Sequence, residues 1–164
     1  MKKLTILLAL TLCSLTFAQS KFDIHAGLGT LNIKKEQFLN YEVGATYYPA
    51  TNLGLYLNAN YSQTEIKDVN NIKLTSDITN VQLGIKYNIK SKNFTFSPMF
   101  GFSLFNTDET YFIEKKTSLA TDLGLAITYD LSEKFAVGIK TVNFFSSHAN
   151  ASISQTNFIL LYKL

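Results

Sequence analysis

Hydrophobic and polar side chains alternate along most of this chain, and the alternation is clearest between residues 38 and 61. Before Pro49 the apolar parity consists of Tyr41, Val43, Ala45 and Tyr47. After the Pro-containing turn it consists of Leu53, Leu55, Leu57, Ala59 and Tyr61. A period of two is typical of strands, so two such runs around a short turn predict a β-hairpin with one apolar face.

The same pattern recurs along the chain and predicts an all-β protein, an eight-stranded antiparallel up-and-down barrel. The other predicted strands cover residues 22–30, 78–89, 94–105, 118–129, 135–145 and 152–164. The alternation slips between Thr141 and Phe144, which predicts a bulge. Pro98 lies mid-strand on the apolar parity and lacks a backbone donor, so we expect a bulge or a broken ladder bond there.

The predicted connections differ in length. Residues 49–52, 90–93 and 130–134 form short turns, whereas residues 31–37, 62–77 and 106–117 form longer, polar loops. A last, shorter connection lies around residues 146–150. Short turns on one rim and longer loops on the other are typical of a transmembrane barrel with periplasmic turns and extracellular loops.

The first 18 residues are typical of a secretory signal peptide. Met1-Lys2-Lys3 is positively charged, residues 4–15 are largely apolar, and Ala18 is a small residue suited to cleavage. The alternative, a membrane anchor, is disfavoured because the apolar run is shorter than the ~20 residues that span a bilayer. We therefore expect a signal peptide at 1–18 and an outer-membrane barrel domain at 19–164.

Removal of the signal changes the chemistry of the chain. The single cysteine, Cys13, leaves with it, so no disulfide or cysteine metal site is expected. Lys2 and Lys3 also leave, so 15 basic residues become 13 against 12 acidic ones, a net charge of +1. No lysine cluster interleaves with aromatic residues, which argues against nucleic acid as a partner. No cofactor or metal motif is found.

The polar parity favours a membrane barrel over a soluble one. It carries all eight glycines, which are Gly27, Gly29, Gly44, Gly54, Gly84, Gly101, Gly124 and Gly138. In a barrel of eight strands the interior is just wide enough for side chains to fill, and glycines leave room there for long neighbours. A water-facing surface gains nothing from glycine, which weakens strands.

Aromatic residues on the apolar parity mark the short-turn rim. The predicted periplasmic belt consists of Phe22, Tyr47, Tyr87, Phe94, Tyr129, Phe135 and Tyr162. Only the third strand lacks an aromatic there and offers Leu53. Rings at this depth are expected where a barrel meets the headgroup region. A weaker upper belt is predicted from Phe38, Tyr61, Phe102 and Phe145.

This combination resembles the small bacterial outer-membrane β-barrel family, with OmpA-transmembrane-domain-like and OmpX-like members. The resemblance covers the whole chain after the signal and rests on the architecture rather than on a catalytic motif. It implies localisation in the bacterial outer membrane, contact with outer-membrane lipids and lipopolysaccharide, and insertion by the barrel-assembly machinery. The family usually ends on an aromatic residue, whereas this chain ends on Leu164.

Charged residues on the polar parity predict a network inside the barrel. Its members are Glu42, Lys86, Asp122 and Lys140. We expect Asp122 to lie near Lys140 and Glu42 to lie at the height of Lys86, because a buried charge without a partner is costly. The network would plug the lumen. A gated proton or ion path is the alternative.

The sequence favours a non-enzymatic protein of membrane structure or surface interaction. The alternatives are a barrel subunit of an envelope secretion or assembly complex, and a lipid-modifying enzyme. His148 with Ser146, Ser147 and Ser152 suggests the enzyme, but no acid nearby in sequence orients the histidine. His25 is expected to be a satisfied interior residue. The apolar triplet Tyr111, Phe112 and Ile113, flanked by charges, is the candidate for loop-mediated contact with a surface or envelope protein.

Overall fold

The computed structural model describes residues 21–33, 36–67, 73–107, 117–146 and 152–164. They form only strands, turns and bends, and none of them forms a helix long and apolar enough to cross a membrane. The strands are β1 (Lys21–Ile33), β2 (Glu36–Tyr48), β3 (Leu53–Lys67), β4 (Lys73–Tyr87), β5 (Ile89–Ser91), β6 (Phe94–Thr107), β7 (Thr117–Asp130), β8 (Phe135–Phe145) and β9 (Ile153–Lys163).

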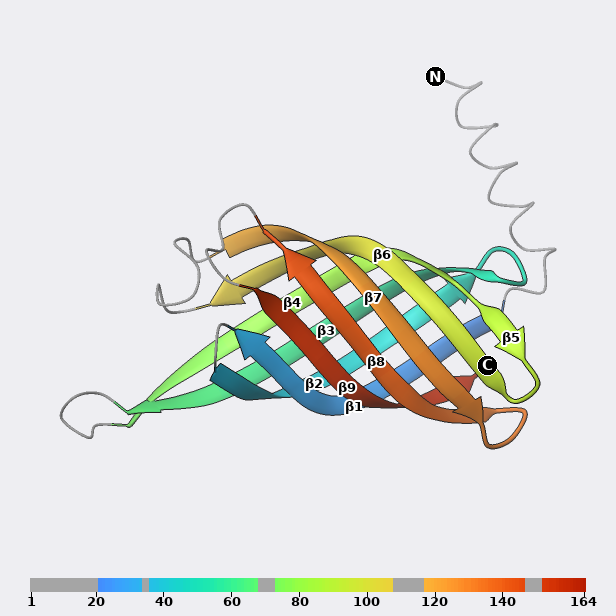
Figure 1. Cartoon of the computed structure of the whole chain (residues 1–164), viewed down its shortest axis with the longest axis horizontal. Coiled ribbons are helices and arrows are strands. Elements are labelled where there is room, and N and C mark those ends of the chain that lie inside the picture. The colour runs from blue at the N-terminus through green and yellow to red at the C-terminus, as the bar shows by residue number, and fades with distance from the viewer. Residues whose placement is uncertain (1–20, 34–35, 68–72, 108–116, 147–151) are drawn as a thin grey trace, which may run out of the picture.

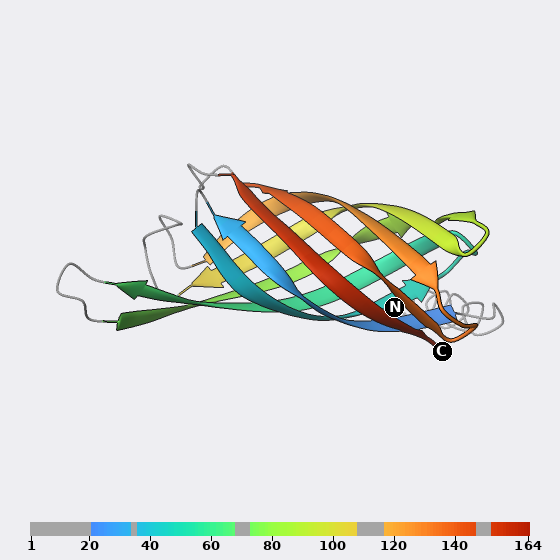
Figure 2. The same cartoon turned by 60° about the horizontal axis from the view of Figure 1, so that its bottom comes forward.

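These strands close into the predicted eight-stranded antiparallel barrel (Figures 1 and 2). Apart from β4 and β5, each strand pairs with its neighbour in sequence, and β1 also pairs with β9 over eleven residues, from Asp23↔Lys163 to Ile33↔Ile153. The barrel is complete because β4 pairs with β6. Closure leaves no free sheet edge along the barrel wall, which is the condition for crossing a hydrocarbon layer with strands.

The short strand β5 continues β4 after an interruption at Asn88. The β4–β6 ladder runs to Lys86↔Met99, and the β5–β6 ladder resumes at Ile89↔Phe96 in the same register. The missing pairs lie opposite Pro98 and Ser97, so the expected break at the proline is confirmed. The amide of Asn88 faces β3 and donates to the Asn52 carbonyl at 2.7 Å, which continues the β3–β4 register one pair beyond Leu53↔Tyr87. The interruption therefore concerns only the edge that faces β6, where proline supplies no backbone donor.

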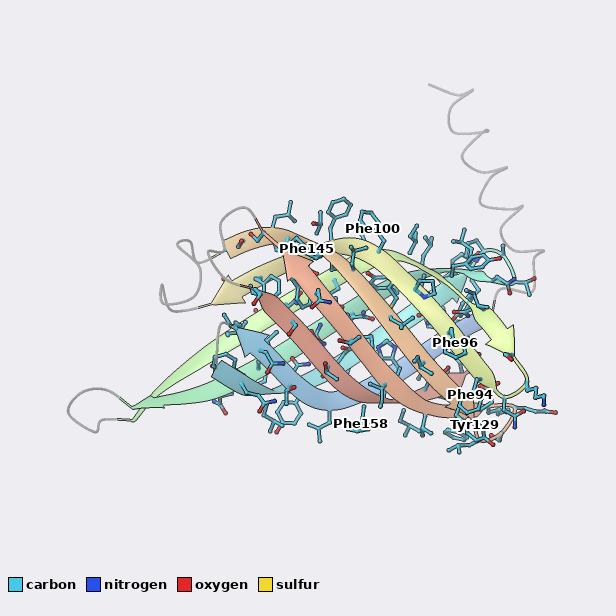
Figure 3. The ribbon with its side chains drawn as sticks, in the orientation of Figure 1. Phe94, Phe96, Phe100, Tyr129, Phe145 and Phe158 are labelled. Carbon is cyan, nitrogen blue, oxygen red and sulfur yellow. The ribbon has the colours of Figure 1, made fainter. Side chains whose placement is uncertain are left out.

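Apolar side chains cover the outside of the barrel. Leu83, Leu119 and Phe158 keep 61%, 61% and 70% of their surface exposed, although they lie within paired strands. Labelled aromatic side chains project outward from the wall along its length (Figure 3). Such a surface belongs in lipid rather than water, because soluble monomers rarely expose large continuous apolar patches.

The seven predicted belt residues all lie on outward-facing positions at the short-turn end. The register pairs six of them across neighbouring strands, as in Phe22↔Tyr47 and Phe94↔Tyr129, whereas Tyr87 lies opposite Leu53. The rings of Phe94 and Tyr129 are 5.0 Å apart, as are those of Phe135 and Tyr162. The belt is thus built largely of touching pairs, and Phe94 and Tyr129 appear together at that end in Figure 3.

Two predicted loops are largely strand. Residues 31–37 were expected to be a loop, but β1 and β2 stay paired to Ile33↔Glu36. Residues 62–77 were also expected to be a loop, but β3 and β4 pair to Lys67↔Lys73 and project beyond the other strands (Figures 1 and 2). The period-two signal fades in this hairpin because neither of its faces is continuously apolar.

The long-loop end of the lumen is apolar, which overturns two further predictions. Phe38 is 1% exposed and faces the lumen, so it is not part of an upper belt, whereas Tyr61, Phe102 and Phe145 do face outward. The ladders of β8 continue without a bulge, and Val142 and Phe144 point inward. The slip in alternation arises because the lumen changes from polar to apolar at this height.

These inward side chains form one buried cluster at the long-loop end of the lumen, which we call the apolar cap. It consists of Leu31, Ile33, Phe38, Ile78, Phe105, Ala120, Val142, Phe144 and Ile153. The rings of Phe105 and Phe144 meet edge to face, with centroids 5.0 Å apart and an interplanar angle of 87°. Edge-to-face packing of this kind adds stability beyond the burial of the rings.

Replacement of Phe144 with Ala is expected to lower the free energy of unfolding by about 3–5 kcal/mol, because it opens a cavity in the apolar cap. The neighbouring Asn143 faces outward, so Asn143→Ala is the matched control and should change stability little. Urea unfolding of the barrel in detergent micelles measures both. Equal effects of the two substitutions would contradict the inward position of residue 144.

The lumen of the barrel as candidate functional site

The lumen consists of three successive layers along the barrel axis. The apolar cap fills the long-loop end, a polar network fills the middle, and a cavity of about 330 Å³ opens at the short-turn end. The network side chains come from inward positions of the strands, the parity that also carries the glycines. In the described part of the lumen, the polar side chains that could bind a ligand or take part in chemistry therefore all belong to strands of the barrel.

Glu42 of β2 is the centre of the network. Its Oε1 accepts from Lys140 Nζ of β8 and lies 2.7 Å from His25 Nε2 of β1. Its Oε2 accepts from Gln155 Nε2 at 2.7 Å and from Asn157 Nδ2 at 2.6 Å, both on β9. Glu42 is 2% exposed, but its carboxylate has four polar partners, so the cost of its burial is compensated.

Amide side chains extend the network outward from Glu42. Gln155 Nε2 also donates to Asn60 Oδ1 at 2.7 Å, and Gln82 Nε2 donates to Gln155 Oε1 at 3.2 Å. Asn40 Nδ2 donates to Asn157 Oδ1 at 3.0 Å, and Asn40 Oδ1 accepts from the Ser62 hydroxyl at 2.7 Å. These bonds join strands on opposite sides of the barrel, so the middle of the lumen is occupied by side chains bonded to one another.

Asp122 forms a second buried site. It accepts from the Tyr56 hydroxyl at 2.7 Å and from Ser103 at 2.6 Å. Tyr56 crosses the lumen because Gly84 and Gly101 lie beneath its hydroxyl; a Cβ at Gly84 would come within 2.6 Å of that oxygen. The sequence expectation that interior glycines make room for long partners holds at these two positions.

All four predicted interior charges are buried, but the structure pairs them differently than expected. Lys140 bonds to Glu42, and Asp122 bonds to Tyr56 and Ser103 instead of Lys140. The β7–β8 register explains this, because Asp122 lies opposite Phe144, four residues beyond Lys140. Counting residues from the turn did not reveal this offset.

Lys86 was expected at the height of Glu42 but lies nearer the short-turn end. It is 9% exposed and lines the open cavity, and its Nζ is 5.3 Å from the centroid of the Tyr48 ring. The four charges therefore form three sites, namely the Glu42–Lys140 pair, Asp122 with its two hydroxyl donors, and Lys86 in the cavity.

Several candidates fall outside the described residues. Tyr111, Phe112 and Ile113 lie there, as do His148 and Ser147. Of the other serines, Ser118 and Ser146 are 2.9 Å apart between their hydroxyl oxygens. His25 lies in the lumen beside Glu42, and no group of three or more His, Cys, Asp or Glu in the described strands is arranged to hold a metal ion.

Sequence reasoning missed Gln155 and Asn157 as hydrogen-bond donors to Glu42, and Tyr56 as a donor to Asp122. It also missed the apolar cap. The positions of the glycines could have revealed the cap, because glycines mark the inward-facing parity of a strand. Ile33 shares the parity of Gly27 and Gly29, and Phe144 shares that of Gly138. The bonding partners need the strand register, which alternation alone does not supply.

The family model described as "Outer membrane protein beta-barrel domain" matches residues 4–162. The chain belongs to this family. The outer-membrane barrel family accounts for the apolar exterior and the closed antiparallel sheet, and it indicates the bacterial outer membrane as the location. No curated protein matches the chain.

Solved barrels share the fold at low sequence identity. The N-terminal barrel of Pseudomonas aeruginosa OprF is 12% identical, with 89% of this chain and 100% of that one covered, at a TM-score of 0.62. Yersinia pestis Ail, solved with the heparin analogue sucrose octasulfate, is 9% identical, with coverages of 88% and 99%, at 0.61. The outer-membrane enzyme PagL is 13% identical, with coverages of 87% and 98%, at 0.53.

Replacement of Lys140 with Met is expected to destabilise the barrel by about 3–5 kcal/mol, because it leaves the Glu42 carboxylate without its buried cation. The double variant Glu42→Gln with Lys140→Met should recover much of the loss. Urea unfolding in micelles gives the three values.

The control for this prediction is Lys163→Met, which removes the rim ion pair of Lys163 with Asp130, 2.7 Å long and partly exposed. Such pairs contribute at most about 1 kcal/mol. A Lys140→Met variant no less stable than Lys163→Met would show that the buried pair does not hold the strands together.

Proposed function

We propose that this outer-membrane barrel has a closed lumen, is not a porin or an enzyme, and acts in membrane structure and surface interaction. The observation that carries the proposal is the filling of the lumen by two successive layers. The polar network ties β2 to β1, β8 and β9 through Glu42, and the apolar cap lies beyond it. Neither layer leaves the continuous polar path that a diffusion pore requires.

The β3–β4 hairpin supports a role at the cell surface. The last pair of β3 with β2 is Leu39↔Gln63, and the last pair of β4 with β6 is Ile78↔Thr107. Beyond them β3 and β4 pair only with each other, to Lys67↔Lys73. The outer backbone edges of this ribbon have no neighbouring strand among the described residues, and such edges accept an added strand from a partner.

The hairpin is therefore suited to binding a protein partner that adds an extended segment to one of its edges. We also infer contact of the exterior with outer-membrane lipids and lipopolysaccharide, cleavage of residues 1–18 on export, and insertion by the barrel-assembly machinery. A subunit role in an envelope secretion or assembly complex is the alternative. It would place the contact at the loops or at the short-turn end, where the described residues form tight turns around the mouth of the cavity.

Planar bilayers containing the refolded barrel are expected to carry no steady open-channel current, because side chains occupy the lumen. A porin reconstituted in the same way serves as the positive control. Heat-modifiable electrophoretic mobility of the same sample verifies that the barrel is folded. A stable current through the folded barrel would refute the closed lumen.

Photo-crosslinking in cells tests the surface role. A photoreactive amino acid at Thr64, just beyond the last β2–β3 pair, is expected to give a specific protein adduct. Lys92, in the tight turn between β5 and β6, is the matched position at the other end. Replacing residues 65–75 with Asn-Gly should abolish the Thr64 adduct while the barrel still folds. An adduct from Lys92 alone would contradict the proposal and favour the envelope complex.

A further inference from the structure

The cavity at the short-turn end of the lumen is a built polar site that the closed-lumen role does not use. Its floor consists of the buried cluster Tyr56, Met99 and Ala126, together with Lys140 and His25 of the Glu42 site. Its mouth reaches rim residues such as Lys90 and Glu133. It is therefore a cup closed toward the outside of the cell and open toward the periplasm.

Two opposite charges face this cup without an ion pair. Asp23 of β1 is 8% exposed and Lys86 of β4 is 9% exposed, and both line the cavity. Among the described side chains, the ion pairs shorter than 4.0 Å join Glu42 to His25 and Lys140, and Lys163 to Asp130. Neither Asp23 nor Lys86 belongs to one of them.

Both charges lie beside Tyr48. The Lys86 ammonium lies over the Tyr48 ring, 5.3 Å from its centroid, and the Tyr48 hydroxyl lies beside the Asp23 carboxylate. Gly54 allows this arrangement, because a Cβ there would come within 2.9 Å of the Tyr48 ring and 3.2 Å of the Lys86 side chain. The wall thus places the ammonium at the ring of Tyr48 and the carboxylate at its hydroxyl, without an ion pair between the two charges.

The remaining polar groups of this wall lie around Tyr48. Thr46 and Asn88 both line the cavity beside the Tyr48 hydroxyl, and Asn88 accepts a hydrogen bond from Ser97 at 2.7 Å. Asp23 and Lys86 are therefore the two buried charges of the cup without an ion-pair partner among the described residues. A buried charge without such a partner is costly, so the two charges point to a bound molecule that pairs with them.

We propose that this cup binds a small zwitterion of the amino-acid class from the periplasm. The carboxylate of the ligand lies against the Lys86 ammonium, and its ammonium group lies against the Asp23 carboxylate. A molecule with only one charge would leave the opposite wall charge buried and unpaired. The volume of about 330 Å³ lies at the lower end of the range of small-molecule sites.

Solution NMR of the isotope-labelled barrel in micelles tests the proposal. Glycine, β-alanine and 4-aminobutyrate are the probes, because they place the two charges at increasing separation; acetate and methylammonium are the single-charge controls. At least one zwitterion is expected to shift the amide signals of Thr46 and Tyr48 at about 10 mM, a concentration that detects millimolar dissociation constants. The single-charge molecules should shift them far less.

Variants assign the charges. Asp23→Asn and Lys86→Met should each weaken binding of the zwitterion roughly ten- to a hundredfold, the range of a charge-assisted hydrogen bond. Lys92→Met, an exposed lysine that does not line the cavity, should leave binding unchanged. Heat-modifiable mobility verifies the fold of each variant, and the wild-type titrations remain decisive if a variant does not fold.

Two results would overturn the inference. Acetate binding as tightly as the best zwitterion, with loss only in Lys86→Met, would make the cup an anion site. No shift at Thr46 or Tyr48 with any of the three zwitterions would show that the cup holds only water. Both results leave the closed lumen and the surface role intact, because those depend on the cap, the network and the β3–β4 hairpin.

Discussion

The Glu42 carboxylate is the interaction on which the interior of the barrel depends. It lies in a wall whose outer side is apolar, and it has been removed from water together with its counterion. Burial of this kind is tolerated only when every lone pair is used. Donors from β1, β8 and β9 meet that condition, so one side chain of β2 fixes the relative positions of four strands. The side-chain amides of Asn40, Asn60 and Gln82 then bond to the residues that contact Glu42.

Much of the fold was predictable from alternation alone. The strand β8 begins and ends as predicted, at Phe135 and Phe145, and the aromatic pairs at the turn end follow from parity. Alternation reports which face of a strand meets lipid, and lipid is the same for every strand. It failed where the environment changed with height, as at Phe38 and Val142, because the lumen is polar in the middle and apolar at the outer end.

The candidate sites were less predictable for a different reason. Parity places Glu42, Lys86, Asp122 and Lys140 inside, yet which of them touch depends on how far each strand is shifted along its neighbour. A shift of four residues separates Asp122 from Lys140, and it is set by the turn and the packing of the whole barrel. The long hairpin of β3 and β4 was hidden because strands outside the membrane have no continuous apolar face to reveal their period.

The position of Gln155 and Asn157 on β9 has a consequence for biogenesis. These two side chains supply half of the partners of Glu42, and β9 is also the strand that closes the barrel against β1. Pairing of β9 with β1 therefore closes the barrel and also completes the hydrogen bonds of the Glu42 carboxylate. A chain that lacks its final strand, or threads it out of register, retains an unsatisfied carboxylate in its interior. Correct docking of β9 thus closes the sheet and removes that penalty together.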